Sequence, residues 1–123
     1  MDAKQLVKQG YDFFNTGNME GFMNLLHDDC IWTFPGDSSP LSGTHKGKVA
    51  IMKTMSNIPS LWTNFTVTPE FMISEGNKVF VKVNAKADGA DTIFGHYFEV
   101  EGDKLKSMMT FDDTLSMSNA MIK

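Results

Sequence analysis

The stretch DDCIWTFPGDSSPLSGTHKGKVAI, residues 28–51, joins an aromatic strand, a loop rich in Pro, Gly and Ser, and the start of a helix. Trp32 and Phe34 recur at the two-residue period of a strand, and the Pro-Gly pair that follows them is a turn signal. Apolar residues at three-to-four spacing between positions 49 and 55 then form one helix face. This order predicts a strand that ends at the mouth of a pocket, with the rest of the chain forming its walls.

The flanking segments predict helices before this stretch and strands after it. Residues 3–15 carry a broad apolar stripe at helical spacing, Gly17 suits a helix end, and Asn18 can cap a second helix. A break at Pro59 is followed by extended segments separated by turns, at 63–74, 79–84, 93–100 and 105–115. Pro69 is expected at an edge or a bulge, because proline cannot donate to a central ladder. We therefore expect an α+β fold in which three N-terminal helices pack on a curved, mostly antiparallel sheet.

Length and composition limit the classes of protein and partner. With 123 residues, 41% apolar and 11% aromatic content, the chain can bury one core, so residues 1–123 are expected to form a single domain. The net charge of −4 argues against a nucleic-acid partner, because phosphate binding depends on clustered positive charge. Every basic residue is a lysine, so no guanidinium is present to hold a carboxylate or phosphate at two points.

The cysteine content and the length of the apolar runs indicate the cellular compartment of the protein. Cys30 is the only cysteine, which rules out an intrachain disulfide and fits a reducing environment, and we interpret it as a packing residue. The N-terminal residues lack the apolar run of a signal peptide, and nowhere do about 18 apolar residues follow one another. A cytoplasmic protein with no membrane partner is expected.

Two segments resemble the NTF2-like superfamily, especially its SnoaL-like polyketide cyclase branch, which is related to ketosteroid isomerases. They are HDDCIWTFPGDSSPLSGTHKGKVAI at 27–51 and KLKSMMTFDDT at 104–114, and the resemblance extends over almost the whole chain. It implies a cone-shaped α+β fold with a pocket for a small apolar cyclic or polyketide-like molecule. No cofactor is expected. The scaffold carries isomerases, cyclases, dehydratases and non-catalytic binders, so the resemblance leaves the reaction open.

The end of the last predicted strand supplies the candidate acid. Matching Lys104-Leu105 to the usual Lys-Ile of the family makes Asp113 the family acid. Strand alternation places Asp113 on the cone-lining face with Leu105, Met109 and Phe111. Asp112, the second candidate acid, would then point away from the cone. A carboxylate in an apolar cone would have a raised pKa and could exchange a proton with a ligand. The alternative is a solvated acid at a strand end.

The histidines offer partners for this acid. His96 lies on the face of its strand that carries Phe94 and Phe98, and is expected beside the strand of Asp113 as an acid/base partner or electrophilic donor. A histidine that only bonds a backbone carbonyl inside the sheet is the alternative. His45, between two glycines, is expected in a loop, either contributing to the site or simply exposed. The separated histidines and acids lack paired ligand spacing, so no metal site is predicted.

Large apolar side chains are the candidates for the pocket wall. Flat rings and flexible thioethers suit an apolar, roughly planar ligand. The candidates are Trp32, Phe34, Trp62, Phe65, Phe94, Phe98, Met108, Met109 and Phe111. The same residues would also serve a core and the surface of a homodimer, because an open sheet has a concave face for a pocket and a convex face for a second subunit. Two functions stay open: a proton-transfer enzyme of the isomerase, cyclase or dehydratase type, and a non-catalytic binding or scaffold protein.

Overall fold

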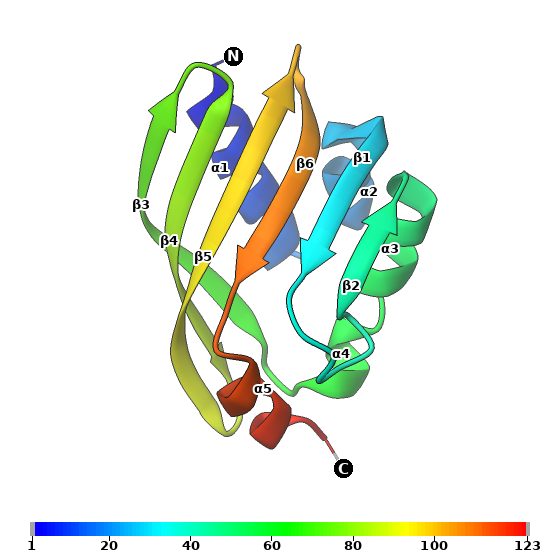
Figure 1. Ribbon diagram of the computed structural model, residues 1–123, viewed down its shortest axis with the longest axis vertical. Coiled ribbons are helices and arrows are strands. Elements are labelled where there is room, and N and C mark those ends of the chain that lie inside the picture. Colours follow the sequence, from blue (N-terminus) through cyan, green and yellow to red (C-terminus); the bar gives the residue numbers. More distant parts are fainter. Residues whose placement is uncertain (1, 123) are drawn as a thin grey trace.

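The computed structural model describes residues 2–122 (Figure 1). The helices are α1 (Ala3–Asn15), α2 (Met19–Leu25), α3 (Lys48–Met55), α4 (Ile58–Leu61) and α5 (Thr114–Ala120). The strands are β1 (Leu26–Phe34), β2 (Gly43–Lys46), β3 (Thr66–Glu75), β4 (Lys78–Ala87), β5 (Ala90–Glu101) and β6 (Lys104–Phe111). None of the helices described is both long and apolar enough to cross a membrane.

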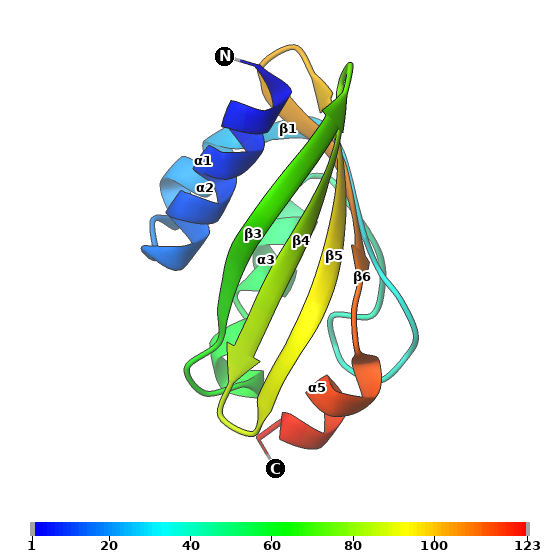
Figure 2. The ribbon, with the colours of Figure 1, turned by 90° about the vertical axis from the view of Figure 1, so that its left-hand side faces the viewer.

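All strands belong to one sheet with the order β2-β1-β6-β5-β4-β3. Strands β1 and β6 pair in parallel and every other pair is antiparallel. Helices α1, α2 and α3 cover one side of the sheet, which we call the inner face; the opposite side is the outer face (Figure 2). The expected α+β arrangement is confirmed. Pro69 lies on the edge strand β3, next to a shift in register, as predicted.

The first two helices form where the sequence predicts them. Asp2 caps α1 by accepting from the amide of Gln5 at 2.8 Å, and the Asp2 amide donates to Gln5 Oε1 at 3.0 Å. Gly17 adopts φ of 75° after α1, a conformation that costs glycine little. Asn18 then caps α2 through the amide of Gly21 at 2.9 Å. These local signals hold α1 and α2 so that their apolar sides cover the inner face.

Three elements were not expected. Strand β2 forms in the segment assigned to a loop, because residues 43–46 pair with the end of β1. Helix α4 contains Pro59 in its first turn, where a missing N–H costs no hydrogen bond. The last strand ends at Phe111 instead of continuing to residue 115, because Asp113 caps the short helix α5.

A bulge in β6 reverses the expected alternation of its side chains. Leu105 pairs with Val100, but Ser107 pairs with Glu99, so Lys106 is an extra residue on β6. Each later side chain therefore occupies the face opposite to the one that unbroken alternation predicts. Met108 and Thr110 are buried on the inner face, while Met109 and Phe111 are 41% and 51% exposed on the outer face. The expected inner set of Leu105, Met109, Phe111 and Asp113 is thus wrong beyond Leu105.

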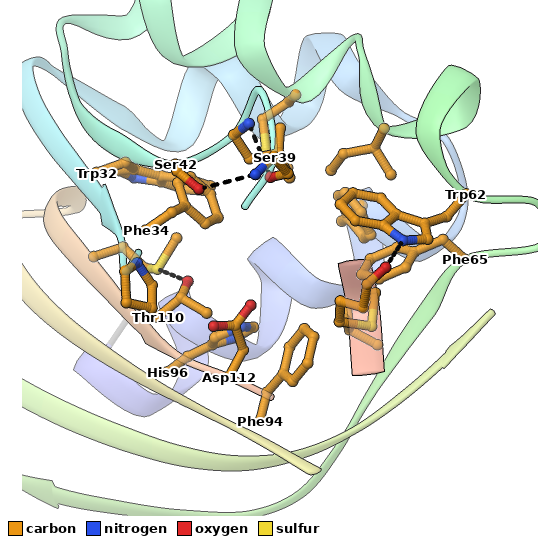
Figure 3. Close-up of a pocket in the computed structure, with 18 of the residues that line it drawn as sticks. Trp32, Phe34, Ser39, Ser42, Trp62, Phe65, Phe94, His96, Thr110 and Asp112 are labelled. Carbon is orange, nitrogen blue, oxygen red and sulfur yellow. Dashed lines mark hydrogen bonds between the residues drawn. The ribbon is translucent and has the colours of Figure 1, made fainter. Parts of the chain in front are cut away.

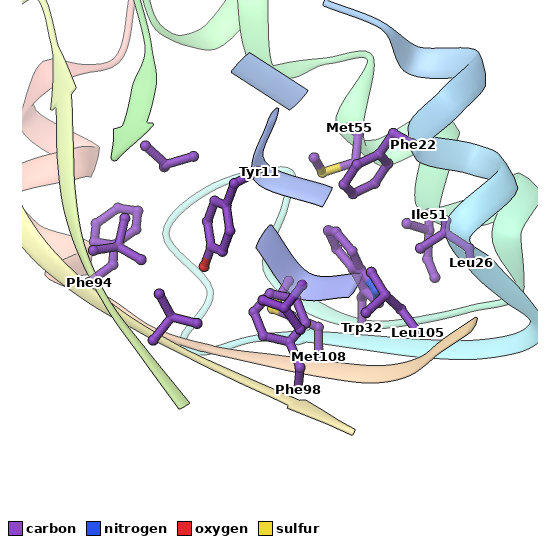
Figure 4. Close-up of a cluster of buried hydrophobic side chains, with 14 of the residues drawn as sticks. Tyr11, Phe22, Leu26, Trp32, Ile51, Met55, Phe94, Phe98, Leu105 and Met108 are labelled. Atoms are coloured by element: carbon purple, nitrogen blue, oxygen red, sulfur yellow. The ribbon is translucent and has the colours of Figure 1, made fainter. Parts of the chain in front are cut away.

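The core lies between the helices and the inner face (Figure 4). Leu26, Ile51 and Leu105 are almost completely buried there. Burying a side chain of this size stabilises the fold by roughly 1.5–3 kcal/mol. Leu105, Trp32 and Phe98 of this core also line the cavity described next, so the cavity adjoins the core.

Candidate functional site

A cavity lies between the inner face, the helices and the 35–42 loop (Figure 3). Its volume, counted as the space open to the centre of a water molecule, is about 100 Å³. One buried water needs about 10–15 Å³ on that measure, so the cavity has space for a molecule of one or two rings. Its lining is mainly apolar, and it includes the end of β1 and the following loop, where the sequence predicts a pocket mouth.

Two pairs of aromatic rings form opposite walls (Figure 3). Trp32 and Phe34 point inward from β1 with ring centroids 6.2 Å apart. Trp62 and Phe65 form the other wall at 5.8 Å, and the Trp62 indole donates to the Met117 carbonyl at 2.8 Å, which ties this wall to α5. The predicted wall residues that line the cavity are Trp32, Phe34, Trp62, Phe65, Phe94, Phe98 and Met108. Met109 and Phe111 do not, because the bulge in β6 turns them outward.

The Trp32 indole N–H lies near the thiol of Cys30. It is buried and makes no hydrogen bond within residues 2–122. Cys30 is fully buried, and burial raises the pKa of its thiol to about 11. Cys30 is therefore a neutral packing residue of the core, in agreement with its interpretation from the sequence.

Asp112 is the carboxylate that lines the cavity. It follows Thr110 by two residues and shares its face, so the expectation that it points away from the cone is wrong; the bulge in β6 is the reason. One of its oxygens, Oδ1, is buried without a hydrogen-bond partner among the described residues. Burial, with a smaller contribution from the neighbouring Asp113 charge, raises the pKa of the Asp112 carboxyl.

Asp113 lies outside the cavity lining, contrary to the expectation that it faces the cone. Its side chain caps α5 by accepting from the Ser116 amide at 3.0 Å and from the Ser116 hydroxyl at 2.6 Å. The Thr92 hydroxyl donates to it at 3.3 Å. The Ser116 bonds, with Thr92 adding less, lower the pKa of Asp113, so this carboxylate is held in its charged form.

His96 points inward from β5, is 9% exposed, and lines the cavity. Its partner is neither Asp113 nor a backbone carbonyl: the Tyr11 hydroxyl lies 2.5 Å from His96 Nδ1. Burial lowers the pKa of His96 to about 4, so the imidazole is neutral at pH 7. Sequence reasoning missed Tyr11, although a hydroxyl on the buried stripe of α1 beside Leu6 and Val7 is a signal, because a buried phenol needs a partner.

His45 is not part of the cavity lining. It lies on β2 opposite Trp32, not in a loop. Its Nε2 is 2.7 Å from the Leu41 carbonyl and its Nδ1 is 3.2 Å from the Thr54 hydroxyl, so the ring connects the 35–42 loop to α3. These contacts of His45 stabilise the position of the 35–42 loop.

Two serines of the 35–42 loop, also missed from the sequence, line the cavity across from His96 and Asp112 (Figure 3). Ser39 Oγ accepts from the Leu41 amide at 3.2 Å, and Ser42 Oγ accepts from the Ser39 amide at 3.3 Å. Because each oxygen accepts a backbone N–H, each hydroxyl proton is left to donate elsewhere. The cavity thus has apolar walls on two sides and polar groups on the other two.

A comparison with known protein families gives a match over most of the helices and strands described above. Residues 7–108, from α1 to Met108 of β6, match the SnoaL-like domain. This chain belongs to the SnoaL-like domain family. The matched segment of this SnoaL-like domain includes Tyr11, Trp32 and His96, and it stops before Asp112.

Solved structures confirm the NTF2-like fold of this SnoaL-like domain. TerC, co-crystallized with polyporic acid, is 22% identical with a TM-score of 0.88, and the alignment covers 96% of each chain. An NTF2-like protein of unknown function from Burkholderia pseudomallei is 22% identical with a TM-score of 0.89, covering 100% of this chain and 99% of the other. A Kribbella flavida protein provisionally named a ketosteroid isomerase is 18% identical with a TM-score of 0.79, covering 90% and 77%. No curated protein matches this SnoaL-like domain.

Asp112 and His96 supply the carboxyl group and the imidazole among the described lining residues of the cavity. Asp112 has a raised pKa and a free oxygen, and His96 is a neutral imidazole held by Tyr11. A carboxyl group of this kind can take or return a proton, while a neutral imidazole can donate a hydrogen bond. Among residues 2–122 no group of three His, Cys, Asp or Glu is placed to hold a metal ion.

Proposed function

We propose that this protein binds a small, mainly apolar cyclic molecule in the cone and acts on it by proton transfer, with Asp112 as the acid/base group. The observation that carries the proposal is the buried, unpaired Oδ1 of Asp112 in an otherwise largely apolar cavity. Burying a polar atom without a partner is costly, and a ligand that hydrogen-bonds to this oxygen would remove the cost. The raised pKa of Asp112 brings a carboxyl closer to the range in which it exchanges protons near neutral pH.

The lining also limits the ligand to neutral molecules. No lysine is among the described lining residues, and the chain has no arginine, so an anion would find no cation in the cavity. The aromatic walls suit a flat ring, and the Ser39 and Ser42 hydroxyls offer donors to an oxygen on its edge. That TerC, a structure of the same fold, was co-crystallized with polyporic acid supports a small-molecule ligand. We therefore propose a neutral, oxygenated ring compound of the polyketide-like kind.

The bicyclic ketone α-tetralone, in D2O, tests the chemistry. Proton abstraction next to its carbonyl replaces hydrogen by deuterium, which NMR detects without knowledge of the natural substrate. We expect the protein to accelerate this exchange and Asp112→Asn to abolish the acceleration. Asp113→Asn serves as the matched control, because an asparagine can still cap α5 and the residue lies outside the cavity lining. Equal acceleration by Asp112→Asn and the unaltered protein would refute the role of Asp112.

A second candidate function is a non-catalytic binding protein with the same pocket. The observation that favours it is the absence of a cation among the described lining residues, since a developing enolate would have only neutral donors around it. Binding of α-tetralone without accelerated exchange would select this function.

We further propose that the protein is a homodimer formed through the outer face. Exposed apolar side chains gather there, namely Ile31, Phe71, Ile73, Phe80, Ile93, Met109 and Phe111. Phe80 and Phe111 contact at 6.4 Å between ring centroids. A Cβ at Gly95 would lie 2.7 Å from the Phe80 ring, so the absence of a side chain there lets Phe80 lie against the sheet. A monomer seldom exposes an apolar patch of this extent, and a second copy would cover it.

The cytoplasmic location expected from the sequence remains a prediction. Fractionation of cells that produce the protein with a C-terminal epitope would test it.

A further inference from the structure

The contact between Tyr11 and His96 joins residues 85 positions apart. Tyr11 comes from the buried stripe of α1 and His96 from the inner face of β5. Their rings lie 5.8 Å apart and are inclined by only 12°, with the hydroxyl oxygen 2.5 Å from Nδ1. Both residues are buried, and Phe98 packs edge-on against both rings. The packing therefore holds the imidazole in one orientation.

The other hydrogen-bond partners available to Tyr11 and His96 indicate which of the two side chains donates in their shared bond. The phenol carries a proton, because burial raises the pKa of Tyr11 far above its usual range. Within residues 2–122 the Tyr11 hydroxyl makes a hydrogen bond to His96 Nδ1 and to nothing else. If Nδ1–H donated to the phenol oxygen, both the phenol proton and the bare Nε2 would lack a partner among the described residues, whereas the reverse direction leaves only Nε2–H without one. In this part of the chain, His96 Nε2 is not among the buried atoms that lack a partner, so this N–H is not sealed in the core. Tyr11 is thus the donor and Nδ1 the acceptor.

A neutral imidazole that accepts at Nδ1 must carry its proton on Nε2. No hydrogen bond from Nε2 to a protein group is present in residues 2–122. Thr110, which lies opposite His96 in the β5–β6 pairing, donates its hydroxyl to Met108 Sδ at 3.2 Å. Asp112 Oδ1 receives no hydrogen bond from any described residue, His96 included. The Nε2–H group is therefore left for a ligand.

We propose that Tyr11 is a positioning residue that holds His96 in its Nε2–H form, so that the imidazole donates to a carbonyl oxygen of the ligand. The proposal rests on the proposed function for the ligand itself and assigns its chemical class: a ketone or related carbonyl compound whose oxygen meets His96. A hydrogen-bonded carbonyl is also more acidic at the neighbouring carbon, which is the position that Asp112 would deprotonate.

The tautomer can be measured without any ligand. Long-range 15N–1H correlation spectra of protein labelled with 15N-histidine distinguish the protonated from the bare ring nitrogen. At pH 7 we expect His96 to be neutral with its proton on Nε2, and Tyr11→Phe to change the Nδ1 shift and admit the other tautomer. Tyr97→Phe is the matched control, because the Tyr97 hydroxyl bonds Glu99 at 3.0 Å and lies away from the cavity. A proton on Nδ1 in the unaltered protein, or a charged imidazole, would overturn the proposal.

The ligand class is tested by comparing α-tetralone with tetralin, which has the same rings but no carbonyl. We expect the unaltered protein and Tyr97→Phe to prefer α-tetralone, and Tyr11→Phe to reduce this preference roughly three- to tenfold, the range for one neutral hydrogen bond. An unchanged preference in a folded Tyr11→Phe variant would refute the donor role of His96. If neither compound binds, the proposed function fails, whereas the tautomer spectra still decide the role of Tyr11.

Discussion

Asp112 and Asp113 are consecutive residues whose carboxyl groups have opposite environments. Asp112 lines an apolar cavity, leaves one oxygen unpaired and has a raised pKa. Asp113 accepts three hydrogen bonds outside the cavity lining and has a lowered pKa. Burial without partners disfavours a negative charge, and hydrogen bonding favours it. Asp112 is therefore the carboxyl group on which the proposed function rests, whereas Asp113 stabilises the start of α5.

Asp112→Asn should stabilise the protein at pH 7. The raised pKa means that ionised Asp112 opposes folding at neutral pH, and an amide of the same shape removes that charge. The half-buried position limits the gain in the free energy of unfolding to about 1 kcal/mol. Urea unfolding at pH 7 measures it, and the gain should shrink as the pH falls and Asp112 becomes protonated. A lower urea midpoint at pH 7 would show that Asp112 has stabilising partners.

Asp113→Ala should destabilise the protein, because it removes the cap of α5. The folded-state pKa of Asp113 is lowered, so its contribution is present above the unfolded pKa and is lost as the pH falls through the folded pKa. Urea midpoints measured from pH 7 to pH 2 should therefore differ between Asp113→Ala and the unaltered protein at neutral pH and converge in acid. Asp113→Asn, which keeps a capping side chain, should lose less than the alanine variant. Equal losses in both variants would contradict the capping role.

His96 should make the fold sensitive to acid. Its folded-state pKa is about 4, below the unfolded value of about 6.5, so the unfolded chain binds the additional proton between these values. Stability should therefore fall as the pH drops from 6.5 to 4, by about 3 kcal/mol when the titration is complete. Asp112 faces the same cavity, and its raised pKa changes the stability with pH in the opposite direction. The difference in the free energy of unfolding between the unaltered protein and His96→Gln therefore isolates the contribution of the histidine. A constant difference over this range would exclude a buried neutral His96.

Phe111→Glu should separate a homodimer into monomers without closing the cavity. Phe111 is half exposed on the outer face, whereas its neighbour Thr110 is buried on the inner face, so a charge at position 111 affects the outer face alone. Sedimentation velocity should show a dimer for the unaltered protein and a monomer for the variant, with α-tetralone affinity retained. Val49→Glu, at an exposed apolar residue of α3, is the control that should remain dimeric. A monomer in the unaltered protein would refute the outer-face dimer.

The sequence alone determined the parts of the fold that depend on neighbouring residues. Local spacing and backbone chemistry account for the apolar stripe of residues 3–15, the helix boundary at Gly17 and Asn18, and the edge position of Pro69. The aromatic end of β1 and its Pro-Gly loop likewise indicated where the cavity lies, because the side chains of residues 30–34 alternate regularly between the two faces.

Only the tertiary structure decided which polar groups enter the cavity. The extra residue Lys106 exists as a bulge only through pairing of β6 with β5, and it exchanges the faces of everything that follows, including Asp112. The Tyr11–His96 bond depends on the docking of α1 against the inner face of the sheet, which no local pattern encodes. Local periodicity thus specifies which elements form, whereas strand register and helix docking specify which side chains meet, because these depend on contacts between distant parts of the chain.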